Sequence, residues 1–149
     1  MIKILSDRLI AFILLSLLVL PIFIPAWLLI CTTSKGGAIY SQRRVGKDDK
    51  PFTLYKFRSM YQDSDKQGFQ TQAGDVRITP VGRFLRKTSL DELPQLWNVI
   101  KGDMSLVGPR PDTPMQKANY SEENWRLRHC VRPGITGLAQ VNGRSNMSA

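Results

Sequence analysis

Two adjacent carboxylates, Asp91 and Glu92, are the residues in this sequence whose types and spacing most clearly allow chemistry. They close the string Ser89-Leu90-Asp91-Glu92, which fits a capping box, and apolar residues at helical spacing follow from 93 to 100. The sequence therefore predicts that both acids lie in the first turn of a helix. There they either complement the helix dipole or act chemically, with Asp91 attacking a phosphorus atom and Glu92 binding the Mg²⁺ that this attack would require.

Several basic residues are candidates for binding phosphate beside these acids. Arg86 precedes Asp91 by five positions, and Arg110 lies between two prolines in the string Gly108-Pro109-Arg110-Pro111. A guanidinium group pairs with two phosphate oxygens at once, which makes both arginines plausible phosphate ligands. Lys56 and Arg58 are two positions apart on a predicted strand, so they would share one face and could converge on one anion. Each of these cations can equally be an ordinary surface charge, and the sequence leaves both interpretations open.

An uncharged apolar run from Leu9 to Cys31 is long enough to cross a bilayer, which takes about 20 residues in a helix. Pro21 and Pro25 interrupt its second half, where each removes a backbone donor and disfavours a straight helix. Basic residues, which favour the cytoplasmic side, flank both ends of the run: Lys3, Arg8, Lys35, Arg43 and Arg44. We therefore predict a re-entrant helix that breaks at the prolines and returns to the side from which it entered. A kinked helix that crosses the membrane once is the alternative.

The elements expected around the candidate residues form a small α+β domain that is mainly helical. Ala38–Gly46 and Phe52–Phe57 are rich in β-forming residues and flank a polar turn, which predicts a β-hairpin. Thr79-Pro80 fits the start of a basic amphipathic helix, which either packs on the core or lies in the plane of the lipid headgroups. Residues 61–78 are polar and contain glycines, and they are interpreted as a loop that could act as a lid.

Charge and cysteine content limit the classes of partner. The chain has a formal net charge of +9 and two cysteines, Cys31 and Cys130, which define no disulfide framework and favour a reducing compartment. The positive charge favours anionic partners, either membrane lipid or phosphorylated small molecules. Nucleic acid is a less favoured partner, because the basic residues are dispersed along the chain and the sequence has no zinc-finger or RNA-binding motif. The only histidine, His129, has no cysteine or histidine partner and is interpreted as structural.

Five strings, taken together, resemble the monotopic bacterial sugar transferases, also called phosphoglycosyl transferases. They are Gln42-Arg43-Arg44-Val45-Gly46, Lys56-Phe57-Arg58-Ser59-Met60, the run from Gly82 to Leu96, the run from Gly102 to Pro111, and the run from Arg132 to Val141. The proline-broken apolar helix also fits that family. The resemblance therefore covers nearly the whole chain.

The resemblance implies transfer of a phosphosugar from a UDP-sugar to polyprenyl (undecaprenyl) phosphate, with UMP as the second product, at the start of polysaccharide or glycoconjugate assembly. It implies that Asp91 is the nucleophile and carries a covalent phosphosugar between two half-reactions. Glu92 matches the family's Mg²⁺-binding partner, with Asp91 beside it, and Arg86 matches its phosphate-contacting arginine. The further phosphate-binding candidates are Lys56, Arg58, Arg110 and Arg132.

The resemblance also implies an architecture and a location. A re-entrant membrane anchor over residues 1–34 would precede a catalytic domain over 35–149, with a β-hairpin and interfacial amphipathic helices, on the cytoplasmic face of the bacterial inner membrane. Family members usually continue well past Gly143-Arg144, whereas this sequence ends at Ala149, so we expect a C-terminally short member. A shortened member that only binds nucleotide sugar at the membrane is therefore the alternative, and a Mg²⁺-dependent phosphatase of lipid phosphates is a second.

Overall fold

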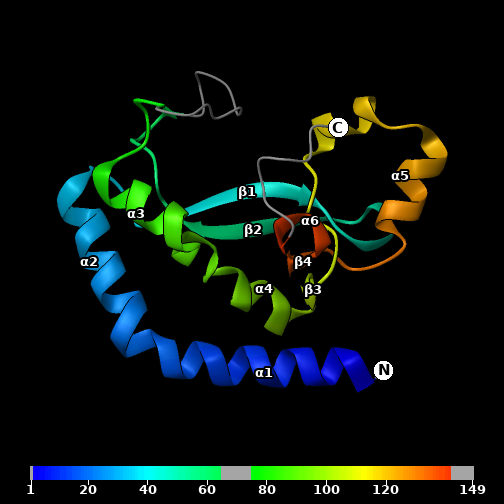
Figure 1. Ribbon diagram of the computed structural model, residues 1–149, viewed down its shortest axis with the longest axis horizontal. Coiled ribbons are helices and arrows are strands. Elements are labelled where there is room, and N and C mark those ends of the chain that lie inside the picture. The colour runs from blue at the N-terminus through cyan, green and yellow to red at the C-terminus, as the bar shows by residue number, and fades with distance from the viewer. Residues whose placement is uncertain (1, 65–74, 142–149) are drawn as a thin grey trace.

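The computed structural model describes residues 2–64 and 75–141, which form a mainly helical structure with short strands (Figure 1). Its helices are α1 (Ile2–Leu18), α2 (Ile24–Thr33), α3 (Pro80–Thr88), α4 (Gln95–Lys101), α5 (Glu122–His129) and α6 (Leu138–Val141). Its strands are β1 (Ile39–Val45), β2 (Pro51–Phe57), β3 (Ser105–Val107) and β4 (Gly134–Thr136). The predicted α+β class, with a β-hairpin and one long apolar N-terminal helix, is confirmed. Residues 65–74 of the predicted loop, and with them its role as a lid, lie outside the described residues.

The apolar N-terminal segment is one bent helix. A π-helical turn, Val19–Phe23, joins α1 to α2; it contains Pro21, and beyond it the backbone N–H of Ile24 donates to the carbonyl of Val19. Figure 1 shows α1 running along one side of the molecule and α2 turning away from that line toward α3. Pro25 lies in the first turn of α2, directly after the π-helical turn. The bend is therefore located at Pro21, and Pro25 begins the second arm.

The bent helix exposes its large apolar side chains. The helix from Ile2 to Thr33 is long and apolar enough to cross a membrane, and only 11% of its most apolar stretch is buried. Its exposed apolar residues are Ile2, Leu5, Leu9, Ile10, Phe12, Ile13, Leu14, Leu17, Val19, Leu20, Ile24, Trp27, Leu28 and Leu29. A core helix of a soluble protein would cover such side chains with protein, so this exposure supports association with a membrane.

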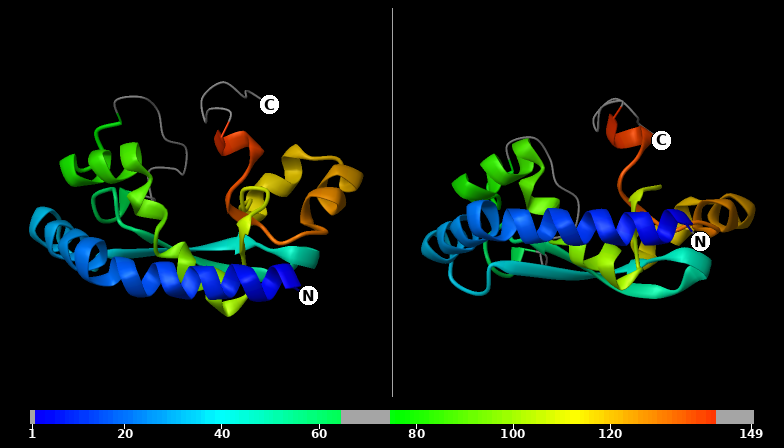
Figure 2. Two further views of the ribbon diagram at one scale, coloured as in Figure 1. Left: turned by 60° about the horizontal axis from the view of Figure 1, so that its bottom comes forward. Right: turned by 90° about the horizontal axis from the view of Figure 1, so that it is seen from below.

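Both arms of the bent helix pack on the same domain. Ala11 of α1 is fully buried against Leu96 and Val99 of α4 and Leu54 of β2. Ala26 and Ile30 of α2 are buried with Phe57 of β2 and Leu85 of α3. Figure 2 shows α1 lying along one side of the domain, in contact with α4. Ala11, Ala26 and Ile30 of the bent helix therefore face the domain, which fills the inside of the bend.

The predicted β-hairpin is confirmed, with its second strand starting at Pro51. β1 and β2 are antiparallel, with Ile39 opposite Phe57 and Val45 opposite Pro51. The outer edge of β2 is held by the fully buried side chain of Asn98 in α4. Its Oδ1 accepts from the backbone N–H of Tyr55 (3.2 Å), and its Nδ2 donates to the carbonyl of Thr53 (2.7 Å). These two bonds fix the strand that carries Lys56 against the helix that follows Asp91 and Glu92.

The C-terminal part adds a parallel pair of strands that the sequence analysis did not predict. Ser105 of β3 pairs with Gly134 of β4, and Val107 pairs with Thr136. A Cβ on Gly134 would lie 2.1 Å from the backbone nitrogen of Gly108, so only glycine permits this close approach. The pairing places Arg132, just before β4, beside the start of β3.

The amphipathic helix expected after Thr79 is α3. The Thr79 hydroxyl accepts from the backbone N–H of Gly82 at 2.9 Å, as an N-cap does. Leu85 is buried in the core, whereas Phe84 is 60% exposed beside exposed Arg83. One side of α3 thus packs on the domain, and an aromatic side chain and a cation point outward.

Candidate active site

Asp91 and Glu92 lie in a 3₁₀ turn, Leu90–Glu92, between α3 and α4. The predicted capping box is wrong: Ser89 has a left-handed backbone (φ 59°) and makes no side-chain cap, but closes the end of α3 by donating its N–H to Arg86. α4 begins only at Gln95, after Pro94, because proline has no N–H and is best tolerated at a helix start. The two acids are therefore held by a short turn and not by the first turn of an α-helix.

Both carboxylates are buried in that turn, with 7% of Asp91 and 4% of Glu92 exposed. Two cations from distant parts of the chain converge on Glu92. Its Oε1 lies 3.3 Å from Nζ of Lys56 on β2 and 3.2 Å from a terminal nitrogen of Arg110. A buried carboxylate needs such partners, because an unpaired ion is costly to remove from water.

The ammonium group of Lys56 is largely buried. Burial lowers its pKa below the usual value of 10.5. The Glu92 carboxylate, and to a smaller extent Asp91, partly offset that decrease, while Arg110 adds to it. Lys56 therefore acts as a desolvated cation shared by the two acids.

Arg86 is positioned near Asp91 from the last turn of α3. Its Nε donates to the Ser59 hydroxyl at 2.7 Å. Burial lowers the pKa of Arg86, and the negative charge of Asp91 partly offsets this decrease. The structure thus brings together five of the predicted site residues: Asp91, Glu92, Arg86, Lys56 and Arg110.

The sequence analysis missed residues that orient these groups. Arg44 on β1 donates hydrogen bonds to Gln42 Oε1 and, at 2.9 Å, to the carbonyl of Pro111. The bond to Pro111 anchors the segment that carries Arg110. Asp112, which is buried, accepts from Arg128, whose other nitrogen donates to the carbonyl of Arg110 at 3.1 Å. No local pattern marks the contacts of Arg44 with Pro111 or of Arg128 with Asp112 and Arg110, because these partners are 16 or more positions apart in the chain.

Two predicted phosphate-binding residues lie away from this cluster. Arg58 follows the end of β2 and donates to the carbonyls of Ser34 (3.1 Å) and Gly36 (3.0 Å), where it fastens the chain after α2. Arg132 donates through Nε to the carbonyl of Gly102 at 2.8 Å, beyond the C-terminal end of α4. The structure does not place either guanidinium beside Glu92. His129 donates through Nδ1–H to the carbonyl of Trp125 (2.8 Å), which agrees with its structural interpretation.

The two carboxylates fit a Mg²⁺ ion that arrives with a phosphorylated substrate. Mg²⁺ in phosphoryl-transfer sites is commonly held by one or two carboxylates, with substrate phosphates and water completing its coordination. Asp91 and Glu92 are adjacent and buried together. Within the described ranges, there is no group of three or more acidic, histidine or cysteine side chains that could hold a metal ion by itself. The two carboxylates could therefore supply part of the coordination of Mg²⁺, with substrate phosphates and water supplying the rest.

The whole sequence, residues 1–149, matches the model of a protein family described as "Bacterial sugar transferase". The chain belongs to this family. This sugar transferase is 48% identical over 133 residues to a Klebsiella pneumoniae protein named "UDP-glucose:undecaprenyl-phosphate glucose-1-phosphate transferase", a match over 87% of the chain and 29% of that protein. It is 47% identical over 136 residues to the Aeromonas hydrophila "UDP-N-acetylgalactosamine-undecaprenyl-phosphate N-acetylgalactosaminephosphotransferase", over 87% of the chain and 32% of the relative.

A third relative is shorter. The Bacillus subtilis "Uncharacterized sugar transferase EpsL" is 53% identical over 109 residues, which are 73% of the chain and 53% of that protein. The chain therefore spans less than a third of the length of the first two relatives and about half of the third.

Proposed function

We propose that this protein transfers a sugar phosphate from a UDP-sugar to polyprenyl phosphate at the membrane surface. The observation that carries the proposal is the buried pair Asp91 and Glu92, with Lys56 and Arg110 on Glu92 Oε1 and Arg86 beside Asp91. A nucleophilic carboxylate surrounded by cations is the arrangement that an attack on a negatively charged diphosphate needs.

The substrate classes follow from the names of the relatives. The names of the Klebsiella pneumoniae and Aeromonas hydrophila relatives both specify a UDP-sugar and undecaprenyl phosphate, and they differ in the sugar. We therefore propose the shared classes, a UDP-sugar and a polyprenyl phosphate, and leave the sugar to experiment.

Transfer is proposed to occur in two steps on Asp91. In the first, a carboxylate oxygen of Asp91 attacks the phosphorus that bears the sugar, the bond from that phosphorus to the bridging oxygen breaks, and UMP leaves with this oxygen. In the second, a phosphate oxygen of the lipid attacks the same phosphorus, and the bond to Asp91 breaks to regenerate the carboxylate. The product is a polyprenyl diphosphate sugar, and the two charged substrates never have to occupy the cluster together.

The neighbouring side chains have distinct roles in this scheme. Arg86 and Arg110 pair with phosphate oxygens, and Lys56 adds a desolvated positive charge. Glu92, with Asp91, would hold Mg²⁺, which when bound supplies positive charge that offsets the repulsion between the carboxylate and the diphosphate.

We further propose that the bent helix is re-entrant and that the domain lies on the cytoplasmic face of the bacterial inner membrane. Two features support this. Both arms, through Ala11 and through Ala26 and Ile30, pack on the same domain, so both ends of the helix are on its side of the membrane. Basic residues also flank both ends, as is typical of cytoplasmic segments. In this proposed arrangement, a soluble donor and a lipid-borne acceptor would both be able to reach the acidic turn.

The proposal is tested by incubating the purified protein in nanodiscs with Mg²⁺, a panel of UDP-sugars and undecaprenyl phosphate. We expect release of UMP together with a lipid-linked diphosphate sugar, and we expect Asp91→Asn to form neither. Release of inorganic phosphate from the lipid without a sugar-linked product would indicate the phosphatase alternative and overturn the proposal.

A further inference from the structure

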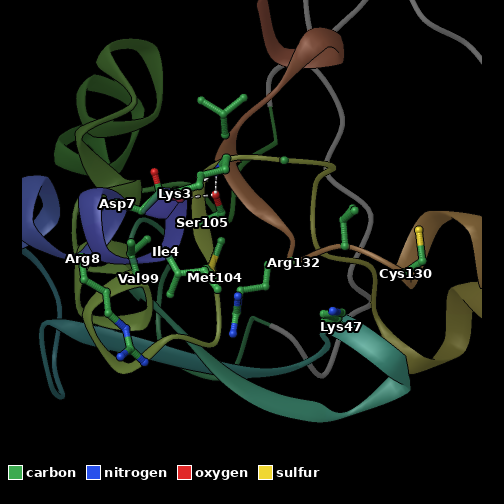
Figure 3. A pocket seen from close by; sticks show the side chains of 13 residues that line it. Lys3, Ile4, Asp7, Arg8, Lys47, Val99, Met104, Ser105, Cys130 and Arg132 are labelled. Atoms are coloured by element: carbon green, nitrogen blue, oxygen red, sulfur yellow. Dashed lines mark hydrogen bonds and ion pairs between the residues drawn. The ribbon is translucent and has the colours of Figure 1, made fainter. Parts of the chain in front are cut away.

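A second cationic site lies at the opposite end of α4 from the acidic turn. An open cavity of about 350 Å³ is lined by the start of α1, the β1–β2 turn, β3 and the segment before β4 (Figure 3). Arg8 donates to the carbonyl of Lys101, and Arg132 donates to that of Gly102, at the C-terminal end of α4. Glu92 precedes the N-terminal end of this seven-residue helix, which is about 10 Å long. The cavity is therefore distinct from the candidate active site.

Positive charge dominates the polar lining of this cavity. Lys3 and Arg8 come from α1, Lys47 from the hairpin turn, and Arg132 from the segment before β4. Asp7 is the one acidic residue among the described residues that line it, and it is paired with Lys3 at 2.7 Å. Figure 3 shows Lys3, Asp7 and Ser105 joined in one group, with Arg132 and Lys47 reaching the cavity from other segments. Four cations against one carboxylate make the cavity suited to an anion.

The remaining lining is apolar, which narrows the class of anion. Ile4, Val99, Met104, Val107 and Val131 form that part of the wall. A fully hydrated inorganic ion gains little from such a surface, whereas an amphiphile can place its charged group on the cations and its glycerol and first methylenes against these side chains.

The cavity also lies next to the proposed membrane surface. α1 contributes Lys3, Ile4, Asp7 and Arg8 to the cavity, while Leu5 and Leu9, on the same two turns, are each 61% exposed. One side of these turns therefore faces the cavity and the other carries the apolar residues available to lipid. A phospholipid at the headgroup level would be within a helix diameter of Lys3 and Arg8, the two cations that α1 contributes.

We propose that this cavity binds the phosphodiester headgroup of an anionic phospholipid. Lys3, Arg8, Lys47 and Arg132 surround the phosphate, and the apolar wall receives the glycerol end of the acyl chains. Bound lipid would link α1, the hairpin turn and the β3–β4 pair, and so hold the domain at one depth on the bilayer. The proposal concerns binding alone and is independent of whether the acidic turn performs transfer.

The test uses native mass spectrometry of the full chain, purified in detergent and stripped of lipid, during titration with short-chain phosphatidylglycerol. Phosphatidylcholine of the same chain length and inorganic phosphate are the two comparison ligands. We expect one phosphatidylglycerol per chain, and weaker binding of both comparison ligands by at least about fivefold, the factor expected for about 1 kcal/mol per basic residue near an anionic lipid.

Two neighbouring lysines provide a matched pair of variants. Lys47 and Lys50 are both exposed in the hairpin turn, but only Lys47 lines the cavity. We expect Lys47→Glu to weaken phosphatidylglycerol binding by at least about fivefold and Lys50→Glu to leave it unchanged. Circular dichroism of both variants shows whether the hairpin substitution has changed the fold.

Cys130 gives a second, position-specific measurement on the unaltered chain. It lines the cavity and is exposed, so bound phosphatidylglycerol should slow its alkylation by a maleimide, as followed by peptide mass spectrometry. Equal binding of phosphatidylglycerol and phosphatidylcholine, equal effects of the two lysine variants, or an unchanged rate of Cys130 alkylation would overturn the proposal. Inorganic phosphate binding as tightly as phosphatidylglycerol would also overturn it and indicate a site for free phosphate.

Discussion

Lys56 is the residue whose protonation should control the candidate site at high pH. Burial lowers the pKa of the Lys56 ammonium group below 10.5, so its positive charge is lost, as the pH rises, earlier than in a free lysine. We predict that KM for the UDP-sugar increases on the alkaline side at a pH below 10.5. In Lys56→Arg this alkaline increase should move to higher pH, because a guanidinium group stays charged. A KM profile that is the same in wild type and Lys56→Arg would contradict this role.

Glu92 should be required because it is buried and its charge is shared by two cations, Lys56 and Arg110. Glu92→Gln keeps the size of the side chain but removes the charge from the contacts with Lys56 and Arg110. We predict a decrease in kcat of about 100-fold or more, the magnitude typical of losing one preorganised electrostatic group. Glu123→Gln is the matched control, because Glu123 is exposed in the first turn of α5. A kcat of Glu92→Gln within twofold of wild type would exclude a direct role.

At the scale of elements, α3 must approach the end of the hairpin very closely to place Arg86. A Cβ on Gly82 would lie 1.9 Å from the backbone oxygen of Ser59, so Gly82→Ala must push α3 away. We predict a decrease in the free energy of unfolding of about 1–3 kcal/mol, together with lower activity, because Arg86 loses its bond to the Ser59 hydroxyl. Gly37→Ala is the control, because nothing lies within 4 Å of a Cβ there. Chemical denaturation of the two variants would show equal stabilities if this packing were unimportant.

Some elements could be predicted from the sequence because their signals are local. The hairpin has β-forming runs on both sides of a polar turn, and Thr79-Pro80 marks the start of α3. The turn that carries Asp91 and Glu92 was predicted wrongly, because Ser89 fits both the start of one helix and the end of another. In the structure Ser89 ends α3, and α4 begins only at Gln95, after Pro94.

The contacts that complete the candidate site could not be predicted in the same way. Glu92 is joined to Lys56 and Arg110 across 36 and 18 positions, and Asn98 joins α4 to β2 across more than 40. Spacing along the chain carries no information about such pairs, which exist only after the core has formed. For the same reason, the sequence could nominate Arg132 as a phosphate ligand but could not assign it to a cavity at the other end of α4.

At the scale of the whole molecule, the bend at Pro21 and the packing of both arms on one domain predict the topology. We expect Ile2→Cys and Lys35→Cys, each made in a chain carrying Cys31→Ser and Cys130→Ser, to be on the same side of the membrane. A membrane-impermeant maleimide should label neither position in intact bacteria and both in inverted membrane vesicles. Both residues are exposed, so burial within the protein does not interfere. Labelling of one position in intact cells and of the other only in vesicles would indicate a single-pass helix.

The arrangement of the molecule gives a reason for the proposed covalent step. In the proposed reaction, a water-soluble donor would approach the domain from solution, whereas the acceptor phosphate would be confined to the headgroup region beside the bent helix. A carboxylate that holds the sugar phosphate between the two visits allows one cluster of cations to serve both substrates in turn. The central claim is therefore that Asp91 carries this intermediate.

Intact-protein mass spectrometry tests that claim most directly. The protein is incubated with Mg²⁺ and each UDP-sugar of a panel in the absence of acceptor. We predict that the wild type gains the mass of one sugar phosphate, that undecaprenyl phosphate then removes it, and that Asp91→Asn gains nothing. Asp48→Asn is the control and should form the adduct, because Asp48 is exposed in the hairpin turn and its left-handed backbone (φ 55°) accommodates asparagine. An adduct on Asp91→Asn, or binding of UDP-sugar with no adduct on any of the proteins, would contradict the claim, and the second result would favour a protein that only binds nucleotide sugar.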